Sequence, residues 1–148
     1  MSTMLYGLTK AQRYLTDLIA GSVTPPAVVD RLALPNATDW SPGALTAEVD
    51  LGEDVTLTPG IVFGGYIGCL VDHFAGLTMM TVLPDDLTFL TSEITIAYRA
   101  PLRPGRARIE GIVRKLGRRQ AYVEVQFHQD GTLTGTGTVE QILRPGAG

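Results

Sequence analysis

One carboxylate and one imidazole stand in the middle of an otherwise apolar or small-residue stretch, GIVFGGYIGCLVDHFAGLTMM at residues 60–80. They belong to Asp72 and His73, and the stretch contains no lysine or arginine. A carboxylate that loses its hydration in such surroundings must be compensated by a partner, protonated, or used in chemistry. Asp72 is therefore the first candidate for a functional residue.

The stretch is long enough for a helix, and residues four apart share one face of a helix. Gly64, Gly68, Asp72 and Gly76 then form a row of small residues that carries the acid. The space along this row suits either another backbone or a ligand, and the acid favours a ligand. The opposite, bulky face is expected to pack on a sheet and consists of Phe63, Ile67, Leu70, Phe74, Leu77 and Thr81.

Gly64 and Gly65 are expected at the N-terminus of this helix. The first amides of a helix have no partners within it and carry the positive end of its dipole. Such amides can hold the oxyanion that develops when a carbonyl carbon is attacked. A glycine pair can also simply make a tight turn, but an acid seven residues further along the same helix favours the oxyanion role.

The remaining candidates for nucleophile, base or metal ligand are weaker. His73 points about 100° away from Asp72 around the helix, so we expect it to be packed or partly exposed. His128 is expected at the surface, and Cys69, which has no partner base, is expected to be a small buried hydrophobe. The sequence has no cysteine–histidine cluster typical of a metal site and no G-x-S-x-G motif of a serine hydrolase.

The elements that position these residues can be predicted from periodicity. An amphipathic helix is expected over residues 8–21, turns over 35–43 and a strand over 44–52. The long helix follows the glycine pair, and four strands come after it. We expect them to form an antiparallel meander with one face on that helix, which is an α+β fold. The strands are expected at residues 87–98, 107–116, 120–129 and 132–143.

Composition limits the function classes. The chain has 148 residues, 45% apolar and 18% charged, as expected for one packed domain. Its net charge of −3 lacks the basic surplus typical of a nucleic-acid binder. The N-terminus lacks a signal-peptide core, and residues 61–83 carry Asp72 without a basic flank, so no membrane span is predicted. We expect a cytoplasmic protein.

Three motifs together resemble the hotdog-fold acyl-CoA thioesterases, particularly the phenylacetate-pathway subgroup. They are G-G-x6-D at the start of the apolar helix, L-T-S-E-I-T-I-A-Y-R-A-P-x-x-P-G, and G-R-x-x-A-Y-V-E-V. The resemblance covers roughly residues 44–143. It implies a curved antiparallel sheet wrapped around one central helix, with residues 1–43 packing as an N-terminal helical segment on a domain at 44–148. It also implies homodimers, often paired into tetramers, with active sites between subunits.

The resemblance also implies roles for individual residues. Asp72 is expected to act as nucleophile or general base, and the Gly64 amide to polarise the thioester carbonyl. Thr91 is expected to orient the water or the acid. Gly65, Gly68 and Phe63 are expected to contact the substrate, which contains the coenzyme A, so no separate cofactor or metal is expected.

The sequence departs from the family pattern around this site. Phe63 stands where the family usually has histidine, Leu57 where it has asparagine or glutamine, and Gly76 where one branch has a hydroxyl. Thr56 or Thr58 could replace the missing amide side chain. These changes affect water activation and substrate orientation but leave the acid and the amide dipole in place.

The chain is acidic overall but contains a basic group, and guanidinium groups suit phosphate recognition. The resemblance implies that the loops near these strands hold the nucleotide part of coenzyme A, so this group is expected to contact its phosphates. Its principal members are Arg99, Arg118 and Arg119, and each alone can equally be an ordinary solvated charge. The wider group adds Arg103, Arg114 and Lys115.

The sequence thus predicts an acyl-CoA thioesterase, with small or aromatic acyl groups favoured. Three alternatives stay open: a non-catalytic acyl-CoA or lipid-binding protein, an enzyme acting on a carrier-protein thioester, and a dehydratase. The dehydratase ranks lower because neither histidine matches the required motif.

Overall fold

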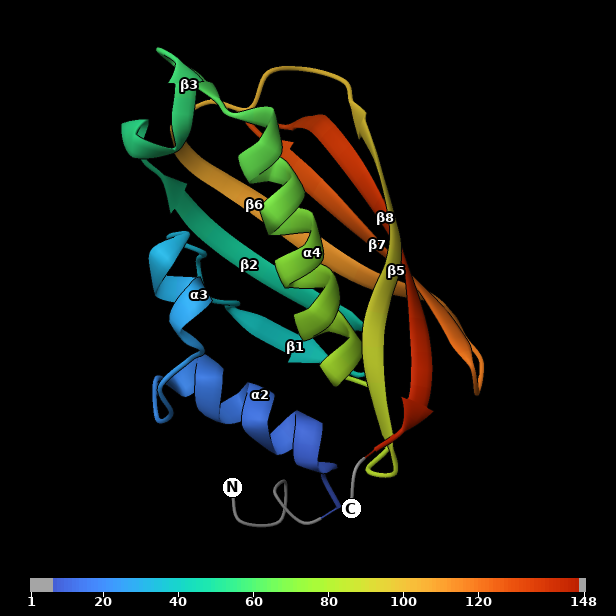
Figure 1. Cartoon of the computed structure of the whole chain (residues 1–148). Coiled ribbons are helices and arrows are strands. Elements are labelled where there is room, and N and C mark those ends of the chain that lie inside the picture. The colour runs from blue at the N-terminus through green and yellow to red at the C-terminus, as the bar shows by residue number, and fades with distance from the viewer. Residues whose placement is uncertain (1–6, 147–148) are drawn as a thin grey trace.

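A curved antiparallel sheet wraps one long helix, α4 (Gly64–Met80), in the computed structural model, which describes residues 7–146 (Figure 1). The sheet has six strands in the order β1-β2-β6-β7-β8-β5. Residues 1–6 and 147–148, the outer ends of the two expected segments, lie outside the described residues. The strands are β1 (Asp39–Ser41), β2 (Ala44–Leu51), β5 (Leu87–Tyr98), β6 (Gly105–Leu116), β7 (Gln120–Gln129) and β8 (Thr132–Pro145).

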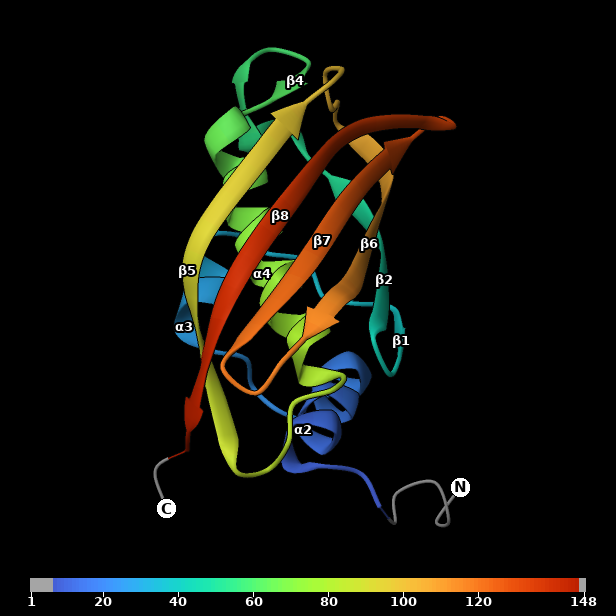
Figure 2. The same ribbon diagram turned by 90° about the vertical axis from the view of Figure 1, so that its right-hand side faces the viewer.

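The expected α+β architecture and central helix are confirmed, but the meander is wrong in one strand. β6, β7 and β8 follow one another as hairpins, whereas β5 pairs with β8 and not with β6. Strand β5 therefore forms one edge of the sheet and β1 the other (Figure 2). The short strand β1 lies in the region where only turns were expected, at residues 35–43.

The bulky face of α4 packs into the concave side of the sheet. Leu70 and Phe74 are buried as expected, whereas Leu77 is buried facing the N-terminal segment; burial of each large apolar side chain contributes about 1.5–3 kcal/mol. Two central strands carry a glycine where the helix lies closest. A Cβ at Gly137 would lie 2.5 Å from a methyl group of Val71, so a side chain there would push the helix off the sheet.

The N-terminal segment folds onto the same concave side, beside β1 and β2 (Figure 1). Helix α2 (Lys10–Ala20) begins with a capping box between Thr9 and Gln12 and ends at Gly21 in the left-handed conformation. Its buried Leu15 anchors it to the core. The short helix α3 (Ala27–Arg31) follows.

The chain between β2 and α4 makes a small separate hairpin. It contains the 3-10 turn η1 (Glu53–Val55) and the strands β3 (Thr56–Thr58) and β4 (Ile61–Val62). The hairpin delivers the chain to the N-terminus of α4. In the part of the chain that the structure describes, none of the helices is both long and apolar enough to cross a membrane.

Candidate active site on helix α4

The N-terminus of α4 presents backbone amides without acceptors. The N-cap residue Phe63 has an extended backbone, with φ −58° and ψ 127°, and provides no side-chain cap. Among residues 7–146, the amides of Gly64, Gly65 and Tyr66 have no hydrogen-bond acceptor. These donors carry the positive end of the helix dipole, so this end of α4 can stabilise a negatively charged oxygen.

The carboxylate of Asp72 is held by a hydroxyl of the neighbouring strand. Thr91 in β5 donates a hydrogen bond of 2.7 Å from its Oγ1 to Asp72 Oδ1. The sequence correctly grouped these two residues, but the expectation of a carboxylate enclosed by apolar groups is wrong, because Asp72 is exposed in this chain. Its ionised form therefore retains contact with water and gains one fixed donor.

The row of small residues faces strand β5. A Cβ at Gly68 would lie 3.7 Å from the side chain of Ile96, and one at Gly76 would lie 3.6 Å from the ring of Phe89. The strand of the same chain thus lies along the row at the point where a ligand was expected. The row allows β5 to approach α4 closely, so that Thr91 reaches Asp72.

Tyr98 links the end of β5 to the start of α4. Its hydroxyl donates a 2.8 Å hydrogen bond to the carbonyl oxygen of Gly64. This contact fixes the orientation of the first helical residue. Tyr98 belongs to the Y-R-A-P motif, but sequence reasoning gave it no role, because strand periodicity does not show which helix residue a strand end meets.

The positions that depart from the family pattern lie around the same helix end. The ring of Phe63 folds over Gly65, where an added Cβ would lie 2.9 Å from the ring edge. Leu57 is largely exposed. The hydroxyl of Thr56 donates to the carbonyl of Glu53 and is therefore occupied within the 3-10 turn.

The matched family is the thioesterase superfamily, whose model covers residues 59–136, just over half of the chain. This match includes the α4 amides, Asp72 and Thr91. The chain belongs to the thioesterase superfamily.

Individual relatives agree with this family. A protein of Saccharolobus solfataricus, provisionally named an esterase, is 33% identical over 92 residues. The match covers 62% of this chain and 65% of that relative, so the chain spans a little less than two thirds of its length.

Solved structures share the hotdog fold. A protein of Ralstonia eutropha JMP134, described as related to phenylacetic acid degradation and provisionally as a thioesterase, has a TM-score of 0.76 at 22% identity, covering 87% of this chain and 98% of that one. A hypothetical thioesterase of Streptococcus pneumoniae TIGR4, solved with coenzyme A, has a TM-score of 0.67 at 19% identity, covering 74% of this chain and 84% of that one.

In this thioesterase-superfamily chain, His73 contacts the N-terminal segment and does not face strand β5, which carries Thr91. Its Nε2 lies 2.9 Å from the carbonyl oxygen of Pro35, and its ring packs edge-on against Phe74. Burial lowers the pKa of His73, although the Pro35 carbonyl and Asp72 act in the opposite direction. The neutral imidazole therefore donates a hydrogen bond to the Pro35 carbonyl. His73 is half-buried, in agreement with the expectation that it is packed or partly exposed.

Tyr66 makes a second link to the same segment. Its hydroxyl donates a 2.6 Å hydrogen bond to the carbonyl oxygen of Ala33, a residue with a left-handed backbone at φ 51°. Burial, with a smaller contribution from Asp54, raises the pKa of Tyr66 to about 12. The hydroxyl therefore stays protonated and keeps donating.

The basic residues do not form one group in a single chain. Arg99 follows Tyr98 at the amide end of α4, and Arg103 lies nearby with its guanidinium 3.3 Å from the Gly60 carbonyl. Arg118 and Arg119 lie in the β6–β7 turn, beside the start of β5. Arg99 follows the end of β5, so the two groups lie at opposite ends of the sheet. Arg114 forms an ion pair with Glu124.

The other expected positions need two corrections. His128, expected at the surface, is half-buried and lies 3.2 Å from the side-chain oxygen of Gln126. Cys69, expected to be buried, is only half-buried. Within residues 7–146, no group of three or more His, Cys, Asp or Glu side chains gathers as metal ligands would.

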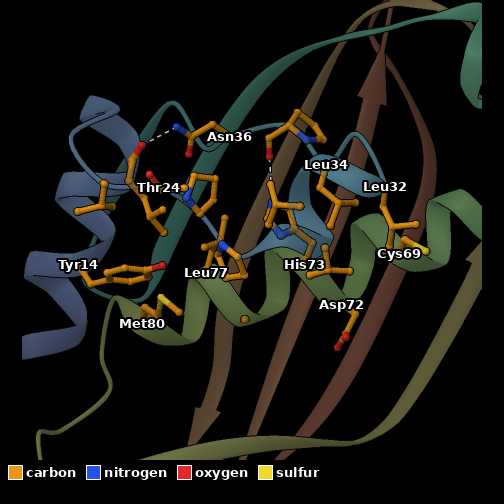
Figure 3. Close-up of a pocket in the computed structure, with 18 of the residues that line it drawn as sticks. Tyr14, Thr24, Leu32, Leu34, Asn36, Cys69, Asp72, His73, Leu77 and Met80 are labelled. Carbon is orange, nitrogen blue, oxygen red and sulfur yellow. Dashed lines mark hydrogen bonds between the residues drawn. The ribbon is translucent and has the colours of Figure 1, made fainter.

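A cavity of about 720 Å³, which the sequence did not reveal, lies between α4 and the N-terminal segment (Figure 3). Cys69, Asp72, His73, Leu77 and Met80 of α4 form one wall. In Figure 3 Asp72 lies at the edge of the cavity, and its carboxylate points away from the His73 ring and out of the cavity. The opposite wall comes from α2, α3 and the residues after them.

Proposed function

We propose that this chain hydrolyses acyl-CoA thioesters to a free acid and coenzyme A. The observation that carries the proposal is the combination, on one helix, of unpaired N-terminal amides and an exposed carboxylate held by Thr91. Membership of the thioesterase superfamily and the coenzyme A in the S. pneumoniae structure support the thioester substrate.

The chemistry requires an attack on carbon and a place for negative charge on oxygen. Asp72 attacks the carbonyl carbon itself or takes a proton from the attacking water. The Gly64 amide donates to the oxygen that becomes negative, and one such donor typically accelerates a reaction about 100- to 1,000-fold. The carbon–sulfur bond then breaks, and the coenzyme A thiolate leaves and takes up a proton. If Asp72 is the nucleophile, water then hydrolyses the acyl–Asp72 anhydride, which releases the acid and restores the carboxylate; if Asp72 is the base, the attacking water itself becomes part of the acid.

These two groups cannot serve one carbonyl within a single chain. Gly64 and Asp72 are eight positions apart on α4, which corresponds to about 12 Å along a helix. A reacting carbonyl must lie about 3 Å from both the nucleophile and the oxyanion donor. A second copy of the chain must therefore supply one of them.

Strand β5 is suited to pair with that second copy. It is a sheet edge, and three of its large side chains are exposed: Leu90 at 53%, Ile94 at 39% and Tyr98 at 57%. Exposed apolar side chains along an unpaired strand edge favour association with another strand. We therefore propose a homodimer joined along β5, which can pair further into a dimer of dimers.

Such pairing also brings the right groups together. In one chain Asp72 contacts Thr91, whereas Gly64 contacts Tyr98 seven residues further along the strand. In an antiparallel pair of β5 strands with its two-fold axis near Ile94, Thr91 of one copy lies beside Tyr98 of the other. Asp72 of one copy then faces the Gly64 amide of the partner subunit.

The same arrangement unites the basic residues. Antiparallel pairing places opposite ends of the two sheets side by side, so the Arg118–Arg119 turn of one copy approaches Arg99 of the other. We propose that these guanidinium groups contact the phosphates of coenzyme A, because guanidinium forks match phosphate oxygens. The resemblance favours a small or aromatic acyl group.

One observation favours a second candidate, a binding protein for intact acyl-CoA. The ring of Phe63 stands over Gly65 where the family pattern has a polar histidine, so it adds no donor at the helix end. A carrier-protein thioester would use the same site. The dehydratase alternative lacks support, since the Nε2 atoms of both histidines lie beside oxygens away from Asp72.

The test is thiol release from a panel of acyl-CoAs by wild type, Asp72→Asn and Gly64→Pro. Proline at the first helical position removes the N–H and adds a small ring, and the φ and ψ angles of Phe63 are compatible with a following proline. Gly64→Ala, which keeps the N–H, is the matched control. We expect hydrolysis to disappear in Asp72→Asn and to fall at least about 100-fold in Gly64→Pro. Gly64→Ala should keep the wild-type rate. Tight binding without any turnover would contradict the hydrolase and favour the binding protein.

A further inference from the structure

The cavity between α4 and the N-terminal segment borders Asp72 but has no place in the chemistry described above. Its volume, about 720 Å³, lies in the range of ligand pockets. We propose that this cavity binds the acyl group of the substrate and selects straight acyl chains of about eight to twelve carbons. This inference rests on the proposed function, and it departs from the small or aromatic acyl group that the resemblance favours.

The lining supports an apolar ligand because most of its side chains are apolar and two of its polar ones are already bonded. His73 Nε2 is bonded to the Pro35 carbonyl, and Asn36 donates a 2.7 Å hydrogen bond to the Leu18 carbonyl. The surface left facing the cavity is mainly aliphatic, with Leu32, Leu34 and Leu77 among its members (Figure 3). A negatively charged acyl group would lose its hydration there, and the lining contains no lysine or arginine to pair with it.

The position supports an acyl group attached to a thioester at Asp72. Asp72 lies on the rim with its carboxylate directed out of the cavity, and Met80 lies toward the far end of α4. The eight positions between them span about 12 Å of helix. An extended alkyl chain advances about 1.25 Å per carbon, given carbon–carbon bonds of about 1.5 Å, so about ten carbons fill this length.

The outer wall is attached firmly enough to form a pocket. Gln12 of α2 donates a 2.8 Å hydrogen bond to the Thr81 carbonyl at the end of α4. Tyr66 and His73 bind the carbonyls of Ala33 and Pro35 after α3. These contacts join the N-terminal segment to α4 on both sides of the cavity, so the wall is built from this chain alone.

The experiment measures kcat/KM for butyryl-, octanoyl-, decanoyl- and palmitoyl-CoA with wild type, Val28→Trp and Leu116→Trp. Val28 lines the cavity and is 52% exposed, so a larger side chain there narrows the cavity without disturbing the core. Leu116, at the end of β6, is similarly exposed at 45% but is not a lining residue, which makes it the matched control.

In wild type we expect kcat/KM to rise with chain length, by up to about fourfold per methylene, and to stop rising beyond about twelve carbons. Val28→Trp should lower the decanoyl-to-butyryl ratio at least about tenfold, equivalent to two methylene contributions or more, and Leu116→Trp should not change it. Active enzyme that is indifferent to chain length would overturn the pocket while leaving the hydrolase intact. A changed oligomeric mass in Val28→Trp would also overturn it, by showing that a second copy fills the cavity.

A binding measurement separates the pocket from the chemistry. Calorimetric affinity of Asp72→Asn for the same acyl-CoAs is expected to increase with chain length and to lose that dependence when Val28→Trp is added. If wild type hydrolyses none of these substrates but this dependence is present, the hydrolase proposal fails and the pocket is supported. If neither turnover nor chain-dependent binding is found, both fail.

Discussion

Asp72 differs from an ordinary surface carboxylate because a hydroxyl of another element holds it in place. Thr91 Oγ1 donates to Asp72 Oδ1 at 2.7 Å, and the exposed carboxylate keeps its other oxygen for a substrate or water. The glycine row explains this geometry, since an added Cβ at position 68 or 76 would already be in van der Waals contact with β5, and side chains longer than alanine would hold β5 away from α4. At the scale of the residue, the site depends on small groups that allow two elements to approach.

The first prediction concerns Thr91. Thr91→Val removes the donor but keeps the shape, so Asp72 loses its fixed orientation. We expect kcat to fall about tenfold, because a hydrogen bond to a charged group contributes about 1.5–3 kcal/mol and water partly replaces it at this exposed site. Steady-state kinetics with Thr91→Ser as the rescue variant provides the test. Equal activity in Thr91→Val and wild type would show that the hydroxyl does not position the acid.

The second prediction concerns Tyr98, whose hydroxyl donates to the Gly64 carbonyl. Tyr98→Phe leaves the ring beside Gly64 but releases the first peptide of α4. We expect kcat to fall about two- to tenfold with little change in KM, in line with about 0.5–1.5 kcal/mol for a neutral hydrogen bond. Tyr122→Phe, on β7, serves as control. A rise in KM alone would indicate that Tyr98 contacts the substrate and does not orient the amide.

At the scale of elements, the N-terminal segment is attached to α4 through hydrogen bonds, and one of the donors, His73, has an ordinary pKa near neutral pH. Burial lowers the pKa of His73 in the folded protein below its ordinary value of 6.5. The unfolded chain therefore binds a proton more readily than the folded chain as the pH falls through this range. Stability from this residue is fully present above about pH 6.5 and is lost as the pH falls through the lowered pKa.

We therefore expect the free energy of unfolding to decrease from pH 7 toward pH 5, and to decrease less in His73→Gln. Glutamine retains a donor for the Pro35 carbonyl but does not titrate. Urea unfolding of both proteins across this pH range measures the difference, and the shared carboxylates cancel in the comparison. Identical pH profiles would contradict the buried, neutral state of His73.

The sequence predicted most elements, because each carries its own local signal. The helix of residues 8–21 and the helix after Gly64 have clear periodicity. Alternation marked β2, β6 and β7, β-branched and aromatic composition marked β5, and the Asp130–Gly131 turn marked the start of β8. Alternation indicates which residues share a face but not which strand lies beside which, so the pairing of β5 with β8 was missed. The short β1 was missed because its three residues resemble a turn.

The candidate site was predicted only as far as helix geometry reaches. Spacing on one helix placed Gly64, Gly65 and Asp72 correctly, and the resemblance brought Thr91 to Asp72. The exposure of Asp72, the contact of Tyr98 with Gly64 and the cavity beside α4 depend on how distant segments pack. Such contacts leave no periodic signal in the sequence.

At the scale of the whole molecule, one chain contains both parts of the proposed site but holds them about two helical turns apart. The central claim is that two copies combine Asp72 of one with the Gly64 amide of the other. Two inactive variants then complement each other, since a mixed dimer of Asp72→Asn and Gly64→Pro chains contains one site with both groups intact.

The most direct measurement is acyl-CoA hydrolysis by such mixed dimers, purified through two different tags and compared with each variant alone. Our account predicts about half of the wild-type activity per dimer, because one of the two sites is whole, while each parent variant is nearly inactive. Mixed dimers as inactive as their parents, with an unchanged oligomeric mass, would contradict a site shared between two chains.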